Sequence, residues 1–357
     1  MVTIRDVAHA AGVSRGTASN VFTHPELVSE ALRERVLAAA AKLAYGGPNP
    51  KGRLLSGGKV NAIGATPAGS YGITGAFSAP YRREFLLGVA QICDQRGASL
   101  TLISGIEEDK TWGIKNALVD GFILHTIEDA AIVAARRRRL PLVLVDMEGD
   151  SETSSVRVDD RSGTRAAAAH LVGLGHRRFA VFSVLRQDYE TRGVSGEPIF
   201  HGANEARHRL MRGFSIDDAR LAGYADALAE VGLSIDDVPI IESSADTVAN
   251  AIRGASLLFD KAPGVTAVLS MTDVQALAVL EEARRRHISV PRDLSVVGFD
   301  DIPEAARSDP PLTTVVHPMV EKGRVAARLL FDTGAAKQIV LPVSLTIRGS
   351  TAPSRNH

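Results

Sequence analysis

From residue 60 to the end, the chain alternates short apolar segments with longer stretches of helical spacing, and this alternation restricts the fold more than any other feature. The apolar segments predict strands at 61–65, 99–104, 121–125, 142–146, 179–183, 267–271 and 295–299. The spacing predicts helices between them, for example at 84–96, 164–173, 221–231 and 273–286. Strand–helix alternation is typical of parallel sheets whose two faces are covered by helices. We therefore predict an α/β body for residues 60–357.

The length of the chain indicates a further, smaller unit at the N-terminus. At 357 residues, the chain exceeds the roughly 100–200 residues of an ordinary domain. We predict an all-α unit at 1–46, a linker at 47–59 and a larger body of two lobes. Apolar residues make up 45% of the chain, which is enough for several cores.

The single cysteine, Cys93, excludes an internal disulfide framework and suits a reducing compartment. We expect it to be a buried helix residue. The N-terminus lacks the basic and apolar regions of a signal peptide, and no apolar run reaches the roughly 18 residues of a membrane helix. These features predict a cytoplasmic protein without a membrane partner.

The net charge is zero, but the charges are unevenly distributed along the chain. Residues 1–59 hold eight Lys or Arg and four acidic residues, whereas the remainder holds 33 basic and 37 acidic residues. Such an asymmetry indicates a head that faces nucleic acid, joined to a slightly acidic body.

Three predicted short helices, with a glycine between the first two, form a helix-turn-helix pattern in this head. Thr3 and Asp6 are spaced as in a capping box, and Gly12 can adopt a positive φ in the turn. Ser14 can cap a second helix at 15–22, and a third helix follows. In this arrangement the start of the second helix enters the major groove. A three-helix unit with an ordinary polar surface is the alternative at this point.

The outward positions at the start of the second helix are the candidates for DNA contact: Ser14, Arg15, Gly16, Thr17, Ser19 and Asn20. Arg15 can read guanine, and Asn20 can both donate to and accept from adenine. Ser14, Ser19 and the N-terminus near Thr3 can hold phosphates.

Several segments of the head match a known pattern when they are read together: 2–8 (Val-Thr-Ile-Arg-Asp-Val-Ala), 11–14 (Ala-Gly-Val-Ser), Thr17, Ser19, 28–29, Tyr45 and 48–50. With them the head resembles that of the lactose-repressor (LacI/GalR) family. The resemblance implies a hinge helix after 48–49, with Leu55 inserted into the minor groove and Asn49 and Arg53 near phosphates. Gly52 stands where the family commonly has alanine, a loss of about 1 kcal/mol of helix propensity. We therefore expect a hinge that folds only on DNA.

The body continues this resemblance at Arg165, 170–171, 175–177, 220–224, 295–301, 311–315 and 341–343. The resemblance implies a periplasmic-binding-protein-like domain with an effector in the cleft between its lobes. The N-lobe would comprise about 60–158 and 317–341, and the C-lobe about 161–314 and 344–352. The chain would cross between them near 158–161, 315–317 and 341–344.

Ligands of parallel sheets bind beyond the carboxyl ends of strands. The residues predicted there are His125, Asp146, Thr272, Asp273, Asp300 and Asp301. The resemblance makes Arg220 and Asp300 the first candidates for effector binding and Asp146 and His125 the second, with a stacking wall formed by Phe77 and Tyr81. A guanidinium fork and a carboxylate suit a polyol or a nucleoside. Structural alternatives stay open: a loop cap for Asp146, packing for His125, a helix N-cap for Asp273.

Three departures from the family pattern leave the identity of the effector open. Thr272 stands where sugar-binding members often have a polar amide, and Pro318 and Met319 replace other side chains. The segment 186–219 is longer than usual. We interpret it as a surface loop, with a lid over the cleft as the alternative.

The sequence shows no phosphate loop, dinucleotide fingerprint, nucleophile elbow or trio of metal ligands, so we predict no cofactor, no metal and no catalysis. We predict a transcriptional regulator, with repression as the favoured mode, that binds a pseudopalindromic operator as a homodimer. A sugar is the first choice of effector, and a purine or nucleoside is the second. An α/β hydrolase with an incidental basic head and a solute sensor that does not touch DNA are the competing hypotheses.

Overall fold

The structure is a computed structural model, and it describes residues 2–23, 25–45, 60–67, 72–104, 111–126, 128–184, 197–203, 216–243, 248–332 and 334–355. The chain divides into two compact units, Met1–Ala62 with Leu118–Asp120 and the rest of the chain. We call residues 2–45 the head and residues from 60 onward the body. The predicted hinge residues Asn49, Arg53 and Leu55 lie outside the described residues, so their roles stay predictions.

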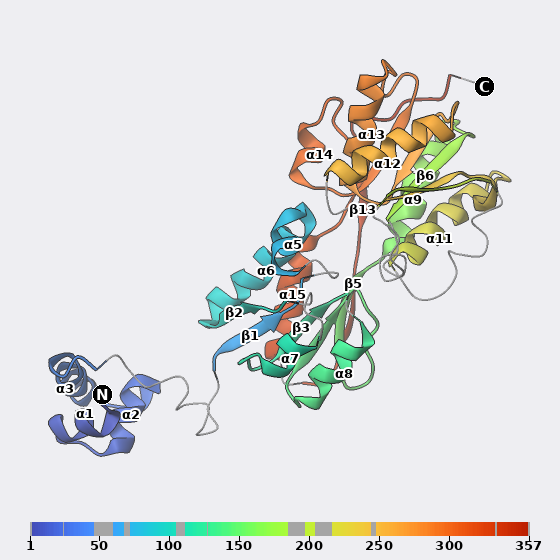
Figure 1. The fold of residues 1–357 in the computed structure, drawn as a ribbon. Helices are drawn as coiled ribbons and strands as arrows, with labels where there is room; N and C mark the ends of the chain where they lie inside the picture. Colours follow the sequence, from blue (N-terminus) through green and yellow to red (C-terminus); the bar gives the residue numbers. More distant parts are fainter. Residues whose placement is uncertain are drawn as a thin grey trace. The chain divides into compact units, whose positions relative to one another are not determined.

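The head consists of the three predicted helices and a short 3-10 turn: α1 (Ile4–Ala10), α2 (Arg15–Thr23), η1 (Pro25–Leu27) and α3 (Glu30–Lys42). Apolar side chains at helical spacing, including Val7, Ala18 and Val36, form one buried core. Gly12 has a φ of 61° in the turn between α1 and α2, a conformation that glycine adopts without steric cost. Figure 1 shows the three helices packed together.

Local side chains begin the first two helices as predicted. The Asp6 carboxylate accepts hydrogen bonds from the backbone N–H (2.7 Å) and the hydroxyl (2.8 Å) of Thr3. The Ser14 hydroxyl accepts a hydrogen bond of 3.0 Å from the backbone N–H of Thr17. Both contacts satisfy polar groups at helix starts, which otherwise lack partners.

The body contains two sheets, and we call the lobe around the first sheet the N-lobe. Its strands lie in the order β12-β5-β4-β3-β1-β2. They are β1 (Ala62–Ala65), β2 (Ser99–Leu102), β3 (Phe122–His125), β4 (Leu142–Val145), β5 (Ser154–Val158) and β12 (Gln338–Leu341). The helices of this lobe are α5 (Gly72–Ser78), α6 (Pro80–Arg96), α7 (Trp112–Asn116), α8 (Asp129–Arg137) and α15 (Met319–Phe331).

The second sheet forms the C-lobe, with strand order β13-β11-β10-β9-β6-β8-β7. The strands are β6 (Phe179–Val184), β7 (Ile199–His201), β8 (Ile240–Ser243), β9 (Ala267–Ser270), β10 (Ser295–Asp300), β11 (Thr313–Val316) and β13 (Ser344–Thr346). The helices are α9 (Asp160–Gly173), α11 (Ile216–Ala229), η3 (Ile235–Asp237), α12 (Val248–Lys261), α13 (Asp273–Arg285) and α14 (Pro303–Arg307). The inner strands pair in parallel, and the edge strands β7 and β13 pair antiparallel.

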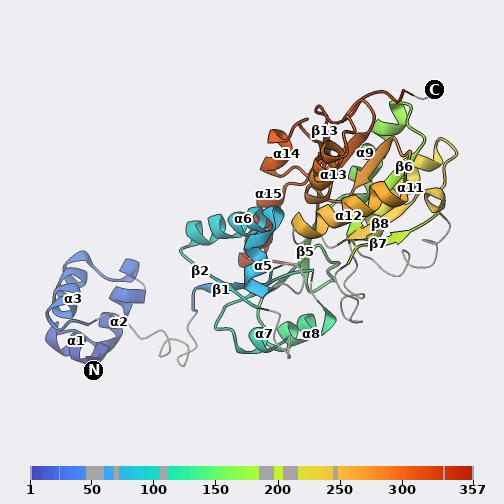
Figure 2. The ribbon, with the colours of Figure 1, turned by 45° about the horizontal axis from the view of Figure 1, so that its top comes forward.

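Burial on both faces explains why inner strands such as β3, β4 and β6 are mostly apolar. In the C-lobe, α9 and α11 pack on one face of the sheet, and α12 and α13 pack on the other. In the N-lobe, α6 and α15 share a core with β1, β3, β4 and β5. The helix pairs α6–α15 and α9–α11 lie side by side (Figures 1 and 2). Cys93 is buried in α6, as expected.

The chain passes three times between the two sheets: after Val158, after Val316 and after Leu341. These crossings bring the end of β4, the start of α9, the end of β10 and the start of α15 into one region. No helix among the described residues is both long enough and apolar enough to cross a membrane.

The seven predicted strands are confirmed, with ends that differ by at most two residues. The surface-loop interpretation of 186–219 is wrong for part of that segment. Ile199–His201 forms the edge strand β7, which pairs with β8, and α11 begins at Ile216. Residues 186–196 and 204–215 lie outside the described residues.

Candidate functional site

The candidate DNA-binding surface is the start of α2. Ser14, Arg15 and Gly16 are exposed there, whereas Ala18 is buried in the core of the head. Thr17, Ser19 and Asn20 are half-buried, and Thr3 is exposed. In the described part of the chain, no side chain forms an ion pair with Arg15. A guanidinium in this position is available to a nucleic acid, and its contact with DNA stays a prediction.

Two pockets open between the lobes of the body. The first, of about 300 Å³, is lined by residues that include Asp146, Asp160 and Ala219. The second, of about 340 Å³, is lined by residues that include Tyr81, Asp300 and His317. Both pockets take residues from both lobes, so we call the two pockets and the buried polar groups between them the cleft.

Asp146 is the centre of the polar cluster on the N-lobe side of the cleft. It follows β4 with a φ of 55°. Its Oδ2 accepts hydrogen bonds from Lys322 Nζ (2.5 Å) and His125 Nε2 (2.8 Å). Its Oδ1 is buried and has no hydrogen-bond partner among the described residues. Burial alone would raise the pKa of Asp146, but Lys322 and His125 outweigh it and hold the pKa well below its usual range.

A chain of hydrogen bonds connects this cluster to the C-lobe. Lys322 Nζ lies 2.8 Å from His317 Nε2, and His317 Nδ1 lies 3.2 Å from Asp300 Oδ1. Burial and the neighbouring Lys322 lower the pKa of His317 well below its usual value, so its ring is neutral. Burial raises the pKa of Asp300 to about 7, although Arg220 and Lys322 oppose this. Asp300 can therefore exchange a proton near neutral pH.

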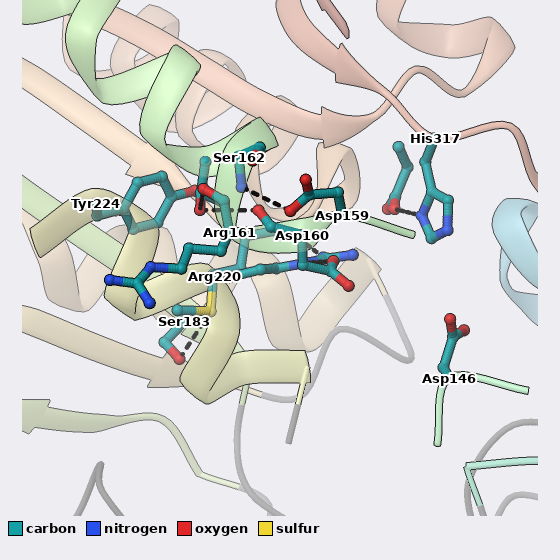
Figure 3. A network of polar contacts seen from close by, with 12 residues as sticks. Asp146, Asp159, Asp160, Arg161, Ser162, Ser183, Arg220, Tyr224 and His317 are labelled. Atoms are coloured by element: carbon teal, nitrogen blue, oxygen red, sulfur yellow. Dashed lines mark hydrogen bonds and ion pairs between the residues drawn. The ribbon is translucent and has the colours of Figure 1, made fainter. Parts of the chain in front are cut away.

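Arg220 lies on the C-lobe side of the cleft, on α11. Its Nε donates to Asp160 Oδ1 (2.8 Å), one of its Nη atoms donates to the Met271 carbonyl (2.5 Å), and its guanidinium lies 3.7 Å from the centre of the Phe299 ring. Burial raises the pKa of Asp160, and Arg220 opposes this increase. Figure 3 shows Arg220 and Asp160 together, with Asp146 and His317 on the other side of the view.

The remaining predicted effector residues divide into cleft and structural positions. Tyr81 is half-buried and lines the second pocket, and Phe77 is 56% exposed on α5. Thr272 is the N-cap of α13, because its hydroxyl accepts from the backbone N–H of Gln275. The N-cap alternative for Asp273 is therefore wrong.

Asp273 has a different structural role. Its two oxygens accept hydrogen bonds from the Ile302 backbone N–H (2.9 Å) and the Thr314 hydroxyl (2.5 Å), inside the C-lobe. Asp301 forms an ion pair of 2.6 Å with Arg348. Neither carboxylate belongs to the hydrogen-bonded chain of the cleft. The loop-cap alternative for Asp146 is wrong, because its carboxylate accepts from the side chains of Lys322 and His125.

Sequence reasoning missed three residues of the cleft: Asp160, His317 and Lys322. Lys322 gave a signal, because it falls on the stripe of α15 that also carries Met319 and Ala326 and is buried. A lysine on the buried stripe of an amphipathic helix requires a partner. Asp160 and His317 gave none, because each lies at a chain crossing whose partners are far away in the sequence.

An exposed helix-turn-helix head and a two-lobed α/β body with a polar cleft together define a class of protein, the ligand-responsive DNA-binding regulators. Comparisons with known proteins agree. Residues 3–49 match the bacterial regulatory proteins of the lacI family, and residues 168–351 match the periplasmic binding protein-like domain. A transcriptional regulator of the helix-turn-helix type from Mycobacterium tuberculosis is 34% identical, with 98% of this chain and 96% of the relative covered. The chain belongs to the lacI family of transcriptional regulators.

Solved structures show the same architecture over almost the whole chain. The lac repressor dimer bound to operator and the anti-inducer ONPF has a TM-score of 0.76 and 25% identity, covering 98% of this chain and 99% of that one. The transcriptional regulator CelR in complex with cellobiose has a TM-score of 0.68 and 27% identity, covering 98% of this chain and 100% of that one.

Proposed function

We propose that this regulator binds a pseudopalindromic operator as a homodimer through α2, and that a sugar or sugar derivative in the cleft controls the binding, with repression as its mode. The main support for the proposal is the set of polar side chains in the cleft. Carboxylates from opposite lobes, Asp146 and Asp300, converge on it together with Arg220, a side chain rich in hydrogen-bond donors. Such a set suits the hydroxyl groups of a small polar ligand. The complex of CelR with cellobiose supports this ligand class.

Asp300 and Asp146 explain how a ligand would act on the body. They belong to different lobes, so a ligand that hydrogen-bonds to both favours one arrangement of the lobes. Differential affinity for two arrangements is what any effector requires to shift an equilibrium. A coupling between effector and operator of about 1–3 kcal/mol is typical of such proteins.

The effector part of the proposal is tested by thermal melting of the full chain with cellobiose, D-ribose, D-glucose, myo-inositol and adenosine. A ligand at about 100 times its Kd stabilises a protein by roughly 2.7 kcal/mol. We expect at least one sugar to raise the Tm and Asp300→Asn to abolish that increase. Asp94→Asn, on the exposed side of α6, is the matched control and should keep it. An increase that survives in Asp300→Asn would contradict the proposed site.

The DNA part is tested by selection from a pool of random duplexes. The full chain should enrich a pseudopalindrome with half-sites about 34–36 Å apart. Arg15→Ala should reduce discrimination at one base pair of each half-site by about 1–3 kcal/mol. Arg33→Ala, on the exposed face of α3, removes the same charge and should leave the sequence preference unchanged. If the wild type enriches no sequence at moderate salt, the proposed operator binding is wrong.

A further inference from the structure

Lys322 has an unusual position for a lysine. It lies on α15 with its side chain 0% exposed, and it lines neither of the two pockets. Its ammonium contacts Asp146, which lines the first pocket, and His317, which lines the second. Burying an ammonium is costly unless its charge and its hydrogen bonds are satisfied. Lys322 therefore forms a hydrogen bond with one polar residue of each pocket, although it lines neither pocket.

The hydrogen bonds around Lys322 have a fixed direction. An ammonium can only donate, so His317 Nε2 must accept from it. The proton of the neutral imidazole then lies on Nδ1, which donates to Asp300 Oδ1. Lys322 thus donates to Asp146 on one side and, through His317, orients Asp300 on the other. Removal of Lys322 would take the cation from Asp146, which would keep only the hydrogen bond with His125, and would leave His317 Nε2 without its donor, so that Asp300 is no longer oriented.

Two buried cations of the cleft are already paired inside the protein. Lys322 balances Asp146 at 2.5 Å, and Arg220 balances Asp160 at 2.8 Å. The second pocket adds Glu84, and it adds Asp301 and Glu321, which pair with Arg348 and Arg324. Arg157 and Arg161 also line the first pocket and Arg324 lines the second, but an anionic group that reaches the buried centre of the cleft would lie beside the Asp146 and Asp300 carboxylates, a costly arrangement at short range.

The free hydrogen-bond acceptors of the cleft also favour a neutral ligand over an anionic one. Asp146 Oδ1 is buried and lacks a partner among the described residues, so this oxygen has a free capacity to accept a hydrogen bond beside the first pocket. Asp300 uses Oδ1 for His317, and its Oδ2 receives no hydrogen bond from the described part of the chain. Carboxylate oxygens pair with O–H groups, whereas they repel carboxylates and phosphates.

We propose that Lys322 is a positioning residue of the effector site, which holds Asp146 as an ionised acceptor, orients Asp300 through His317, and makes the cleft selective for neutral, hydroxyl-rich effectors over their anionic derivatives. This inference rests on the effector site proposed above. It adds a residue that does not contact the ligand but fixes the charge and direction of two groups that do.

The first test needs no ligand and compares melting against pH for the full chain and three variants: Lys322→Met, Asp146→Asn and the double variant. In Lys322→Met, Asp146 loses its cation and keeps only His125 as a partner, so burial raises its pKa relative to the wild type, and stability is present in acid and lost as the pH rises. In Asp146→Asn, the unpaired ammonium is costly at low pH, and stability returns as the pH rises. Each single change should lower the Tm by roughly 5–15 °C where the remaining charge is unpaired.

The double variant removes both charges, so both opposite pH slopes should disappear. Lys337→Met removes an exposed lysine that pairs with Asp332 and is the matched control, with no new pH slope expected. The inference is overturned if the Tm of the two single variants changes with pH in the same direction. It is also overturned if the loss of Tm in the double variant equals the sum of the two single losses, because Lys322 would then not set the charge of Asp146.

The second test uses pairs of ligands that differ in charge: D-glucose and D-glucuronate, D-glucose and glucose 6-phosphate, D-ribose and ribose 5-phosphate, and cellobiose and cellobionate. We expect at least one neutral member to bind the wild type at least about tenfold more tightly than its anionic partner, and we expect Lys322→Met to lose that binding about tenfold. Tighter binding of an anionic member, or equal binding of the neutral member to Lys322→Met, would overturn the inference and leave the effector site standing. Failure of every ligand to bind the wild type would contradict the proposed sugar effector, and with it the selectivity inferred here.

Discussion

The two lobes build their sides of the cleft in the same way. Each places a buried cation on a helix, Lys322 on α15 and Arg220 on α11, and pairs it with a carboxylate that follows a strand. Each of these helices also packs against its neighbour through glycine. A Cβ on Gly323 would lie 2.1 Å from the Phe85 carbonyl oxygen, and a Cβ on Gly223 would lie 2.2 Å from the Arg161 carbonyl oxygen.

The chemistry of the two pairs differs. The Lys322 ammonium is a compact charge, and the pKa of its partner Asp146 is lowered in spite of burial. The Arg220 guanidinium spreads its charge and stacks on Phe299, and burial raises the pKa of its partner Asp160. Asp300, on the same side, has a pKa of about 7. The N-lobe therefore contributes a fixed charge to the cleft, and the C-lobe contributes Asp300, which can change protonation near neutral pH.

The largest expected effect comes from breaking the C-lobe pair. Arg220→Met leaves Asp160 buried without its cation, and removing one partner of a buried ion pair costs about 3–5 kcal/mol. Urea unfolding of the body measures this loss. The matched control is Arg161→Met, because Arg161 and Asp226 join the same two helices through an exposed pair. Surface pairs contribute little, so the control should unfold like the wild type. Equal losses would show that burial does not distinguish the pairs.

A second experiment tests whether the two lobes differ in protonation near neutral pH. Because burial raises the pKa of Asp300 to about 7, the folded protein binds more protons than the unfolded chain between about pH 4 and 7. This contribution to stability is present in acid and is lost as the pH rises through that window, by at most roughly 1.4 kcal/mol per pH unit. Asp300→Asn should flatten the decline in Tm over this range.

Asp301→Asn is the control for this measurement, because Asp301 is the adjacent aspartate and pairs with Arg348 outside the hydrogen-bonded chain. It should retain the wild-type pH profile. An unchanged profile in Asp300→Asn would mean that the C-lobe does not titrate near neutral pH, and the contrast between the lobes would be lost.

The sequence predicted the head more completely than the cleft, for a physical reason. The contacts of Thr3 with Asp6 and of Ser14 with Thr17 are three residues apart, so local spacing reveals them. The Lys322–Asp146 pair spans 176 residues. These two residues meet only because of the strand order of the sheet and the chain crossings between the lobes. Neither feature can be recognised from a local sequence pattern.

The same reasoning applies within the body. The inner strands that form apolar runs, such as Phe179–Val184, were predicted, because burial on both faces makes them apolar. The inner strands β5, β8 and β11 were missed, because polar residues interrupt their apolar runs. The edge strands β7, β12 and β13 were missed, because they are short and only partly buried. Arg220 and Asp300 were found by family resemblance. The resemblance gave no sign that Arg220 forms an ion pair with Asp160, because that contact is made only in the folded cleft.

The smallest expected effect tests whether the lobes are built alike. Gly323→Ala and Gly223→Ala each force a methyl group against a backbone carbonyl oxygen, and overpacking of this kind costs about 1–3 kcal/mol. Gly173→Ala is the control, because it changes a helical glycine with nothing within 4 Å of the added Cβ. It should be neutral or slightly stabilising, since alanine favours the helix. Similar losses in the first two variants would confirm equivalent helix contacts. If only one lobe tolerates the methyl group, its helix pair can separate, and the likeness between the lobes would extend only to their charges.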